Sequence, residues 1–262
     1  MPPLSPLAAL VRRHDPDRFL TALFAPPERR ETLFLVYAFN HEIARAREVV
    51  SEPTLALIRL QWWREVVEGA RRRHEVAGPL GEALDAGLLD AGDLLAMIEG
   101  REAEAEPDFS SLAAWHGYLS ATAGGVASAA GRALGADRAG LERLRALGTG
   151  YGIAGQLRSV AALARQGRCL LPVEVLEAHG LSVYEVVAEP NAARLLPVLR
   201  ALAAEGGRLL RDAGGRVPRT IVAAALPAVL ARRDLRRVGE PARPRGLGDR
   251  LAVLAAGFSC RV

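Results

Sequence analysis

The sequence contains no lysine, so all 34 of its basic residues are arginines. They are nearly balanced by 30 acidic residues, which leaves a formal net charge of +4. Exclusive use of arginine is typical of a GC-rich bacterial genome and says little about a ligand. No basic stripe is interleaved with aromatic side chains, the pattern that marks nucleic-acid-binding surfaces. We therefore expect no nucleic-acid partner.

Cysteine is also scarce, and the two present, Cys169 and Cys260, have neither zinc-site nor redox spacing. Such a chain suits a reducing compartment, so no disulfide is expected. The N-terminal residues lack the charged-then-apolar order of a signal peptide. The longest apolar run, Ile221 to Ala231, is about half of the roughly 20 residues that span a bilayer and contains Pro227. We expect a cytoplasmic protein that is not integral to a membrane.

Aromatic residues make up only 5% of the chain although half of it is hydrophobic, so the core must consist of leucine, alanine and valine. That composition favours helices. Apolar residues recur three and four positions apart, and no segment alternates with period two. The sequence predicts an all-α protein with a single domain over 1–262, of which 1–14 form a loosely ordered N-terminal segment. The expected helices are 27–50, 91–106, 110–135, 138–166, 191–213, 219–238 and 246–259, with shorter ones near 16–24, 79–89, 173–179 and 182–189.

A further helix is expected after Pro53, where Leu55, Ile58, Trp62 and Val66 follow one another at intervals of three and four residues. That spacing places the four side chains on one stripe of a helix. We expect this stripe, Trp62 included, to face the core.

Two stretches have the layout of a metal-diphosphate site. The first is YAFNHEIARARE at 37–48, and the second is LRSVAALARQGRCLLP at 157–172. Together with RLQWWREVVEG at 59–69 they resemble the squalene/phytoene synthase family, and the resemblance extends over about 15–258. Members of that family join two prenyl diphosphates head to head. The resemblance implies an isoprenoid synthase-like helical bundle, in which the two motif helices face each other across a central cavity.

The acidic residues of these motifs are mostly missing. In the family each stretch carries an Asp-x-x-x-Asp pair, and the corresponding positions here are Ala44 and Glu48, then Ser159 and Leu163. Acids at i and i+4 lie one turn apart on a helix and can share a Mg²⁺ that bridges to diphosphate oxygens. With only Glu48 anionic, we expect no catalytic residues, no metal site and no cofactor. Mg²⁺ would be required only if the protein were an active synthase.

Other residues of the two stretches could form a remnant of the cavity. One face of the first helix carries Tyr37, His41 and Glu48. The second stretch contributes Arg158, Arg165 and Arg168, which match arginines that hold diphosphate in the resembling enzymes. A guanidinium offers paired donors to phosphate oxygens, so diphosphate binding without turnover stays open. The alternative is that His41 and Glu48 pair with neighbouring arginines such as Arg45 or Arg47 on a closed surface.

Two further patterns are weaker signals. The segment Gly150 to Gly155 matches GxGxxG, but no strand precedes it, so we interpret its glycines as points of close helix contact rather than a nucleotide site. Glu102, Glu104 and Glu106 form an acidic cluster, in which Glu102 and Glu106 have the i, i+4 spacing of a relocated metal site. We interpret this cluster as a solvated helix end.

The resemblance is closest to a non-catalytic branch of the family that includes a mitochondrial assembly factor for respiratory complex I and bacterial relatives. In that branch AFN-x-E, a QWW-like triplet and LRSV replace the acidic motifs. It implies a pseudoenzyme that acts as an assembly or interaction factor, with a protein or a membrane-bound complex as its partner. One alternative is an active prenyltransferase that uses farnesyl or geranylgeranyl diphosphate. Another is a non-catalytic binder of a prenyl lipid or its diphosphate.

An arginine cluster near the C-terminus is the candidate contact surface for such a partner. Its members are Arg232, Arg233, Arg236 and Arg237. Arginines of this kind attract anionic lipid or an acidic protein, which would place the protein at the inner face of a membrane. A merely solvated face is the alternative interpretation.

Overall fold

The computed structural model describes residues 4–50, 52–240 and 243–262, and all regular structure within them is helical. The only β pairing in these ranges consists of two isolated bridges, Phe109 with Pro172 and Arg216 with Arg261. The all-α prediction is therefore confirmed. The helices are α1 (Pro6–His14), α2 (Pro16–Ala22), α3 (Pro27–Glu48), α4 (Pro53–Val67), α5 (Ala77–Asp85), α6 (Ala91–Glu102), α7 (Leu112–Leu119), α8 (Gly125–Ala133), α9 (Arg138–Ala164), α10 (Val173–Glu177), α11 (Val183–Ala188), α12 (Leu196–Asp212), α13 (Val222–Ala225), α14 (Pro227–Arg236) and α15 (Leu247–Ser259).

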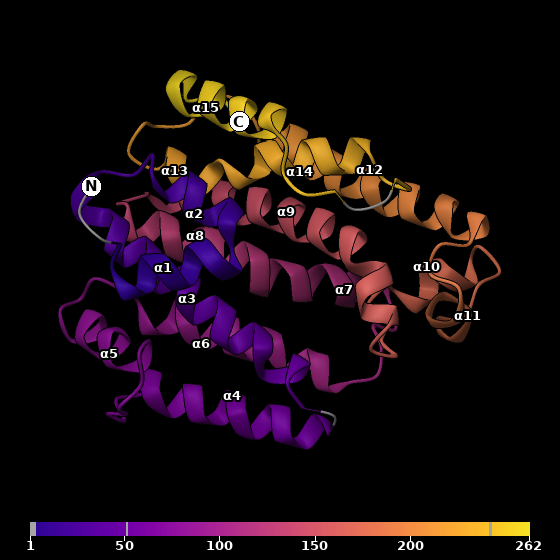
Figure 1. The fold of residues 1–262 in the computed structure, drawn as a ribbon, viewed down its shortest axis with the longest axis horizontal. Helices are drawn as coiled ribbons and strands as arrows, with labels where there is room; N and C mark the ends of the chain where they lie inside the picture. Colours follow the sequence, from indigo (N-terminus) through magenta and orange to yellow (C-terminus); the bar gives the residue numbers. More distant parts are fainter. Residues whose placement is uncertain (1–3, 51, 241–242) are drawn as a thin grey trace.

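The helices are stacked in layers, with the two longest ones near the middle. In Figure 1, α4 forms one edge, α3 and α6 follow, α8 and α9 lie at the centre, and α12, α14 and α15 lead to the opposite edge. The central helix α9 packs against α8, α12 and α14, while α3 packs against α1, α4 and α8. Helix α8 therefore links the two helices that carry the motif stretches.

The expected helix 110–135 is divided. A π-helical segment (Ser120–Gly124) lies between α7 and α8, and α9 approaches it closely. A Cβ atom added at Gly152 would lie 2.7 Å from the Cβ of Ala123, and one added at Gly150 would lie 2.6 Å from Leu210. Both distances are shorter than a Cβ contact allows, so these glycines permit the close packing of α9. The interpretation of the GxGxxG match as helix contacts is confirmed at these two positions.

The N-terminal segment differs from the prediction. Residues 6–14 form helix α1, which begins at the N-cap Ser5 and packs on α3. Leu7 and Val11 lie in the hydrophobic core, and this burial explains why the segment is ordered. Residues 1–3 lie outside the described ranges.

Helix α4 buries a different face from the one expected. Leu55 and Ile58 are exposed and Trp62 is half-buried, although Val66 is in the core. The face that packs on α3 and α6 consists of Ala56, Leu60, Trp63 and Val67. Both sets repeat at intervals of three and four residues, so the spacing alone does not decide which one is buried. The stripe prediction was wrong for Leu55 and Ile58.

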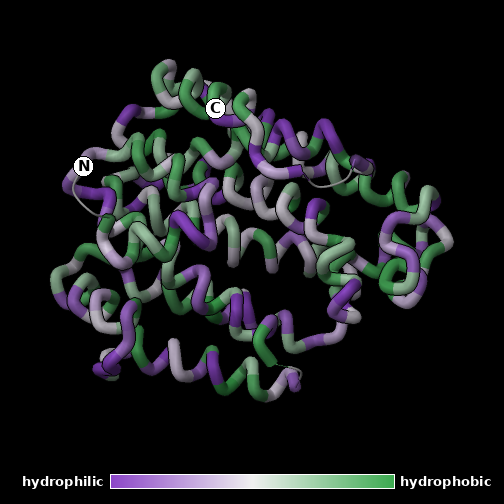
Figure 2. Tube along the Cα trace, in the orientation of Figure 1, coloured by the Kyte–Doolittle hydropathy of each residue, from purple (hydrophilic) through white to green (hydrophobic). Residues whose placement is uncertain are grey.

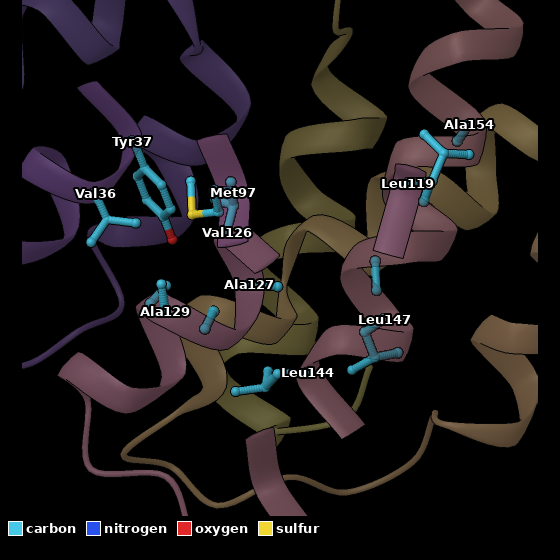
Figure 3. Packing of buried hydrophobic residues seen from close by; sticks show 14 of the residues in the cluster. Val36, Tyr37, Met97, Leu119, Val126, Ala127, Ala129, Leu144, Leu147 and Ala154 are labelled. Carbon is cyan, nitrogen blue, oxygen red and sulfur yellow. The ribbon is translucent and has the colours of Figure 1, made fainter. Parts of the chain in front are cut away.

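Small side chains allow the central helices to lie close together. Figure 3 shows Ala127 and Ala129 of α8 near Tyr37 of α3, with Leu144 and Leu147 of α9 close by. Figure 2 shows hydrophobic residues along every layer, including the two edge helices α4 and α15. No helix in the described ranges combines the length and the apolar character needed to cross a bilayer.

Candidate functional site

The first motif helix places Ala44 beside an internal ion pair. Ala44 lies half-buried on α3, and the space next to it is lined by Arg101 and Glu104, with no room for a water molecule. Arg101 is in the last turn of α6, and Glu104 is in the 3₁₀ turn Ala103–Ala105 that follows. A position that corresponds to a metal-binding acid in the resembling family is thus adjacent to a guanidinium.

Glu104 is the centre of a buried polar network. Arg101 Nη1 donates to Glu104 Oε1 at 2.7 Å, and Arg168 Nη2 donates to Oε2 at 3.1 Å. The hydroxyl of Tyr118 donates to Oε1 at 2.7 Å. Arg101 also donates from Nη2 to Asn40 Oδ1 of α3 at 3.4 Å. The network joins α3, α6, α7 and the segment after α9, so the two motif stretches do converge, through Glu104.

The expectation of a solvated acidic cluster was wrong for Glu104, whose side chain is only 6% exposed. Glu102 bonds Arg64 of α4 at 2.6 Å at the surface, and Glu106 is exposed. A spacing of two residues in a 3₁₀ turn points neighbouring acids in different directions, so the three do not act as one cluster.

The network keeps Glu104 charged and Tyr118 neutral. Burial alone would raise the pKa of Glu104, but the charges of Arg101 and Arg168 and the hydrogen bonds from Tyr118 and Arg101 outweigh it and hold that pKa below its usual range. Burial raises the pKa of Tyr118, and the Glu104 carboxylate raises it further. Tyr118 therefore stays a hydroxyl donor, and Glu104 stays an anion between two cations.

The second motif stretch contains no carboxylate. The hydroxyl of Ser159 donates to the carbonyl of Gly155 at 2.8 Å, and Leu163 lies against Gln156 and Arg168. Glu48 is exposed at the end of α3. Mg²⁺ requires several hard oxygen ligands. Glu104, which lines the space beside Ala44, is already bound by two arginines. The residues present do not fit a Mg²⁺ site, and no group of three or more metal-binding side chains occurs in the described ranges.

The space between α3 and α9 is filled by Arg18 of α2. Its guanidinium lies 5.7 Å from the ring centre of Tyr37 and 4.9 Å from that of Tyr151, and it bonds Asp15 at 2.8 Å. Only about 10 Å³ of free volume remains there, roughly one water molecule. The expected cavity between the two motif helices is therefore closed at this point.

An open cleft of about 830 Å³ lies instead between the N-terminal and C-terminal helices. Its apolar wall includes Phe19 and Leu20 of α2 and Leu230 of α14. On its rim, Arg12 and Arg250 have no ion-pair partner within the described ranges. The cleft thus combines an apolar wall with two uncompensated cations.

A second ion-pair network forms one side of this cleft. Arg245 bonds Asp17 at 2.7 Å and Asp234 at 2.6 Å, and Arg158 bonds Asp234 at 3.2 Å. This network holds α2, α9 and α14 to the segment before α15. Arg158, expected to be a diphosphate ligand, is thus already committed to Asp234.

The remaining predicted site residues are dispersed. His41 stacks on His14 of α1 with ring centres 4.3 Å apart, and burial together with His14 and Arg45 lowers the pKa of His41 to about 4. It is therefore neutral at physiological pH. His41 and Glu48 do not pair with each other, and Arg165 is exposed beyond the end of α9. Of the predicted set, only Arg168 takes part in the Glu104 network.

Only two of the four C-terminal arginines are exposed. Arg233 bonds Asp249 of α15 at 2.6 Å, and Arg232 donates to the carbonyl of Leu210 in α12. Both are half-buried and already bonded within the chain, whereas Arg236 and Arg237 are exposed. Adjacent residues on a helix point about 100° apart, so a run of arginines cannot all face solvent on a packed helix.

Several residues that shape the site were not singled out in the sequence. They are Arg18, Arg101, Tyr118 and Tyr151, together with the acids Asp17 and Asp234. The spacing of Arg101 and Glu104 suits an i, i+3 ion pair, and this was the one available signal. The same spacing is common on solvated helices, so it does not indicate burial.

Comparisons with known proteins agree with this fold. The squalene/phytoene synthase family profile matches residues 11–253. Human NADH dehydrogenase (ubiquinone) complex I, assembly factor 6 is 26% identical over 231 residues, which cover 84% of this chain and 68% of that protein. The Drosophila melanogaster homolog of that factor is 28% identical over 199 residues, 68% of this chain and 57% of the relative.

Solved structures with the same architecture include enzymes. A dehydrosqualene synthase in complex with ligand superposes with a TM-score of 0.81 at 17% identity, covering 97% of this chain and 94% of the other. Squalene synthase HpnC from Alicyclobacillus acidocaldarius gives a TM-score of 0.70 at 20% identity, covering 90% and 94%. At these identities the likeness concerns the fold alone.

Proposed function

The chain belongs to the squalene/phytoene synthase family, and on that premise we propose that it is a non-catalytic member acting as an assembly or interaction factor for a membrane respiratory complex. The observation that carries the proposal is the Glu104 network. Arg101 and Glu104 line the space beside Ala44, and the bond from Arg168 to Glu104 connects the second motif stretch to them without any Mg²⁺ ligand set.

The chemistry of the family explains why this observation matters. Ionisation of a prenyl diphosphate requires cations that neutralise the leaving group, and Mg²⁺ held by carboxylates supplies them in such reactions. Here Arg101 and Arg168 already share the Glu104 carboxylate as their counter-ion, and both are largely buried. A diphosphate would have to displace Glu104 from both arginines at the cost of burying an unpaired carboxylate.

The role in assembly is supported by the relatives. The human and Drosophila proteins are named as complex I assembly factors and match most of this chain. Complex I is a membrane complex, so a related factor would act at the membrane surface. The expected partner is therefore a protein subunit of such a complex.

A turnover assay tests the non-catalytic part. Purified protein is incubated with farnesyl or geranylgeranyl diphosphate and Mg²⁺, beside a purified dehydrosqualene synthase as positive control. We expect diphosphate release and hydrocarbon product at the level of the no-enzyme blank. Squalene, phytoene or a cyclopropyl intermediate formed over multiple turnovers would refute it and would favour the active prenyltransferase.

A genetic assay tests the assembly part. Deletion of the gene in its host should lower rotenone-sensitive NADH oxidation by membranes, and the wild-type gene should restore it. Affinity capture from the complemented strain should recover subunits of the same complex. Unchanged NADH oxidation in the deletion strain would contradict the assembly role whatever the turnover assay gives.

A second candidate function is the binding of an amphiphilic anion, such as a prenyl diphosphate, without turnover. The cleft of about 830 Å³ favours it, because its volume is within the usual range of ligand pockets of about 300–1,000 Å³. Its apolar wall suits a hydrocarbon chain, and Arg12 and Arg250 on the rim suit an anionic head group. A thermal shift with farnesyl diphosphate in the presence of EDTA, absent in an Arg12→Gln/Arg250→Gln variant, would support this binding.

A further inference from the structure

Helix α15 carries a continuous apolar stripe on its outer face. Leu247, Leu251, Leu254 and Phe258 repeat at intervals of four, three and four residues and are 73%, 54%, 38% and 72% exposed. The opposite face is buried through Val253, Ala256 and Gly257. The helix lies at the outer edge of the molecule in Figure 1 and is largely hydrophobic in Figure 2.

The fold does not require this stripe. A surface helix normally buries one apolar face and presents polar residues to water on the other. Here the exposed side carries four large apolar side chains and a single charged one, Arg250. Contiguous exposed apolar side chains of this kind mark interaction sites. Phe258 also packs edge-to-face on Phe24, and the neighbouring Leu23 is exposed.

The exposed charges on α15 and just after it have one sign. Asp249, the sole carboxylate on α15, is 5% exposed and paired with Arg233. The exposed charged side chains on α15 and in the residues that follow it are Arg250 and Arg261. Neither has an ion-pair partner among the residues that the structure places.

We propose that α15 is a lipid-docking helix, which lies in the headgroup region of an anionic bilayer with its Leu247–Phe258 stripe toward the acyl chains and Arg250 near the phosphates. An interfacial helix of this type needs one apolar face and basic flanks, and both are present. The inference deepens the proposed function, because a factor acting on a membrane complex has to reach the bilayer.

The alternative occupants fit less well. A second copy of the chain would bring Arg250 and Arg261 of both copies to one interface without a carboxylate to neutralise them. The stripe is one helix wide and roughly 18 Å long, from twelve residues at 1.5 Å each. A standard protein interface needs about 800 Å² from each partner, considerably more than one such row of side chains provides.

Vesicle co-sedimentation of the full chain tests the proposal. The vesicles are phosphatidylcholine alone, or phosphatidylcholine with about one-third phosphatidylglycerol. The test variant is Leu251→Ser/Phe258→Ser, and the matched control is Leu55→Ser/Ile58→Ser on α4 at the opposite edge. The control residues are also exposed, at 46% and 60%. Circular dichroism melts establish that both variants are folded.

We expect wild type and the α4 control to bind the anionic vesicles, and the α15 variant to bind at least about ten-fold more weakly, because each buried large apolar side chain is worth a factor of ten or more. Arg250→Gln should weaken binding about five-fold, on anionic vesicles only. Absence of wild-type binding, or equal binding by the α15 variant, would overturn the proposal.

Two further outcomes would also overturn it. An equal loss in the α4 control would show that binding is not specific to α15. Analytical ultracentrifugation that finds a dimer in wild type and a monomer in the α15 variant would assign the stripe to a second copy. Vesicle binding depends neither on turnover nor on NADH oxidation, so its failure is distinguishable from failure of the proposed function.

Discussion

Substitution Glu104→Gln preserves the size of the side chain but removes the charge that lies between two buried arginines. The carboxylate is 2.7 Å from Arg101 and 3.1 Å from Arg168, whose side chains are 16% and 12% exposed. Removing one partner of a buried ion pair typically costs about 3–5 kcal/mol, because the remaining charge stays buried and uncompensated. Since a whole domain is stable by only about 5–15 kcal/mol, the free energy of unfolding should fall by a large fraction.

Urea unfolding followed by circular dichroism measures the loss. The midpoint should fall while the slope m is unchanged. The matched control is Glu102→Gln, whose ion pair with Arg64 lies at the surface, with 26% and 38% exposed side chains. A surface pair contributes about 1 kcal/mol or less. If the free energy of unfolding falls by the same small amount in both variants, the argument that Glu104 is a buried counter-charge is wrong.

The loss of stability in Glu104→Gln should depend on pH. Although burial alone would raise the pKa of Glu104, its arginine partners lower it below the ordinary value of about 4.3. A carboxyl whose pKa is lower in the folded state contributes stability above its unfolded pKa and loses that contribution as the pH falls through the folded value. The stability difference between wild type and Glu104→Gln should be constant from about pH 6 to about 8 and shrink below about pH 4. A difference that grows on acidification would refute the assignment.

Two further predictions concern the other polar contacts. Burial and the neighbouring His14 lower the pKa of His41 to about 4, whereas an unfolded histidine binds its proton near pH 6.5, so stability should decline as the pH falls from about 6.5 toward about 4. His41→Asn should reduce that decline in a series of urea midpoints, and an unchanged decline would contradict it. Arg245→Gln removes the shared cation from two carboxylates, Asp17 among them, and should cost about 3 kcal/mol in the same assay. The exposed Arg243→Gln should change stability by less than about 0.5 kcal/mol, and a similar loss in both variants would show that the buried geometry is irrelevant.

Much of the fold could be predicted from periodicity and from chain breaks. The expected helix 138–166 is close to the observed Arg138–Ala164, because Asp137 caps its start and Gly167 follows its end. Rotation about the helix axis was harder to predict. In α4, spacings of three and four residues fit two faces, and only packing on α3 and α6 selects the one with Leu60.

The candidate site was less predictable because its contacts join distant segments. Arg101, Tyr118 and Arg168 meet at Glu104, and Arg101 also donates to Asn40, so the network joins four separate parts of the chain. The family motif indicated Arg168 as a phosphate ligand but gave no sign of an internal carboxylate that would occupy it. Pairing of this kind depends on tertiary geometry, which local spacing does not encode.

The π-helical turn at Ser120–Gly124 sets the rotation of α7 relative to α8 about their shared helical path. Each α-helical residue advances about 100° around the axis, so deleting one residue to restore α geometry would turn α7 by about that angle relative to α8. Tyr118 would then point away from Glu104, and Trp115 away from its partner Gln156. The count of residues in this turn, more than their chemistry, decides which side chains of α7 reach the buried carboxylate.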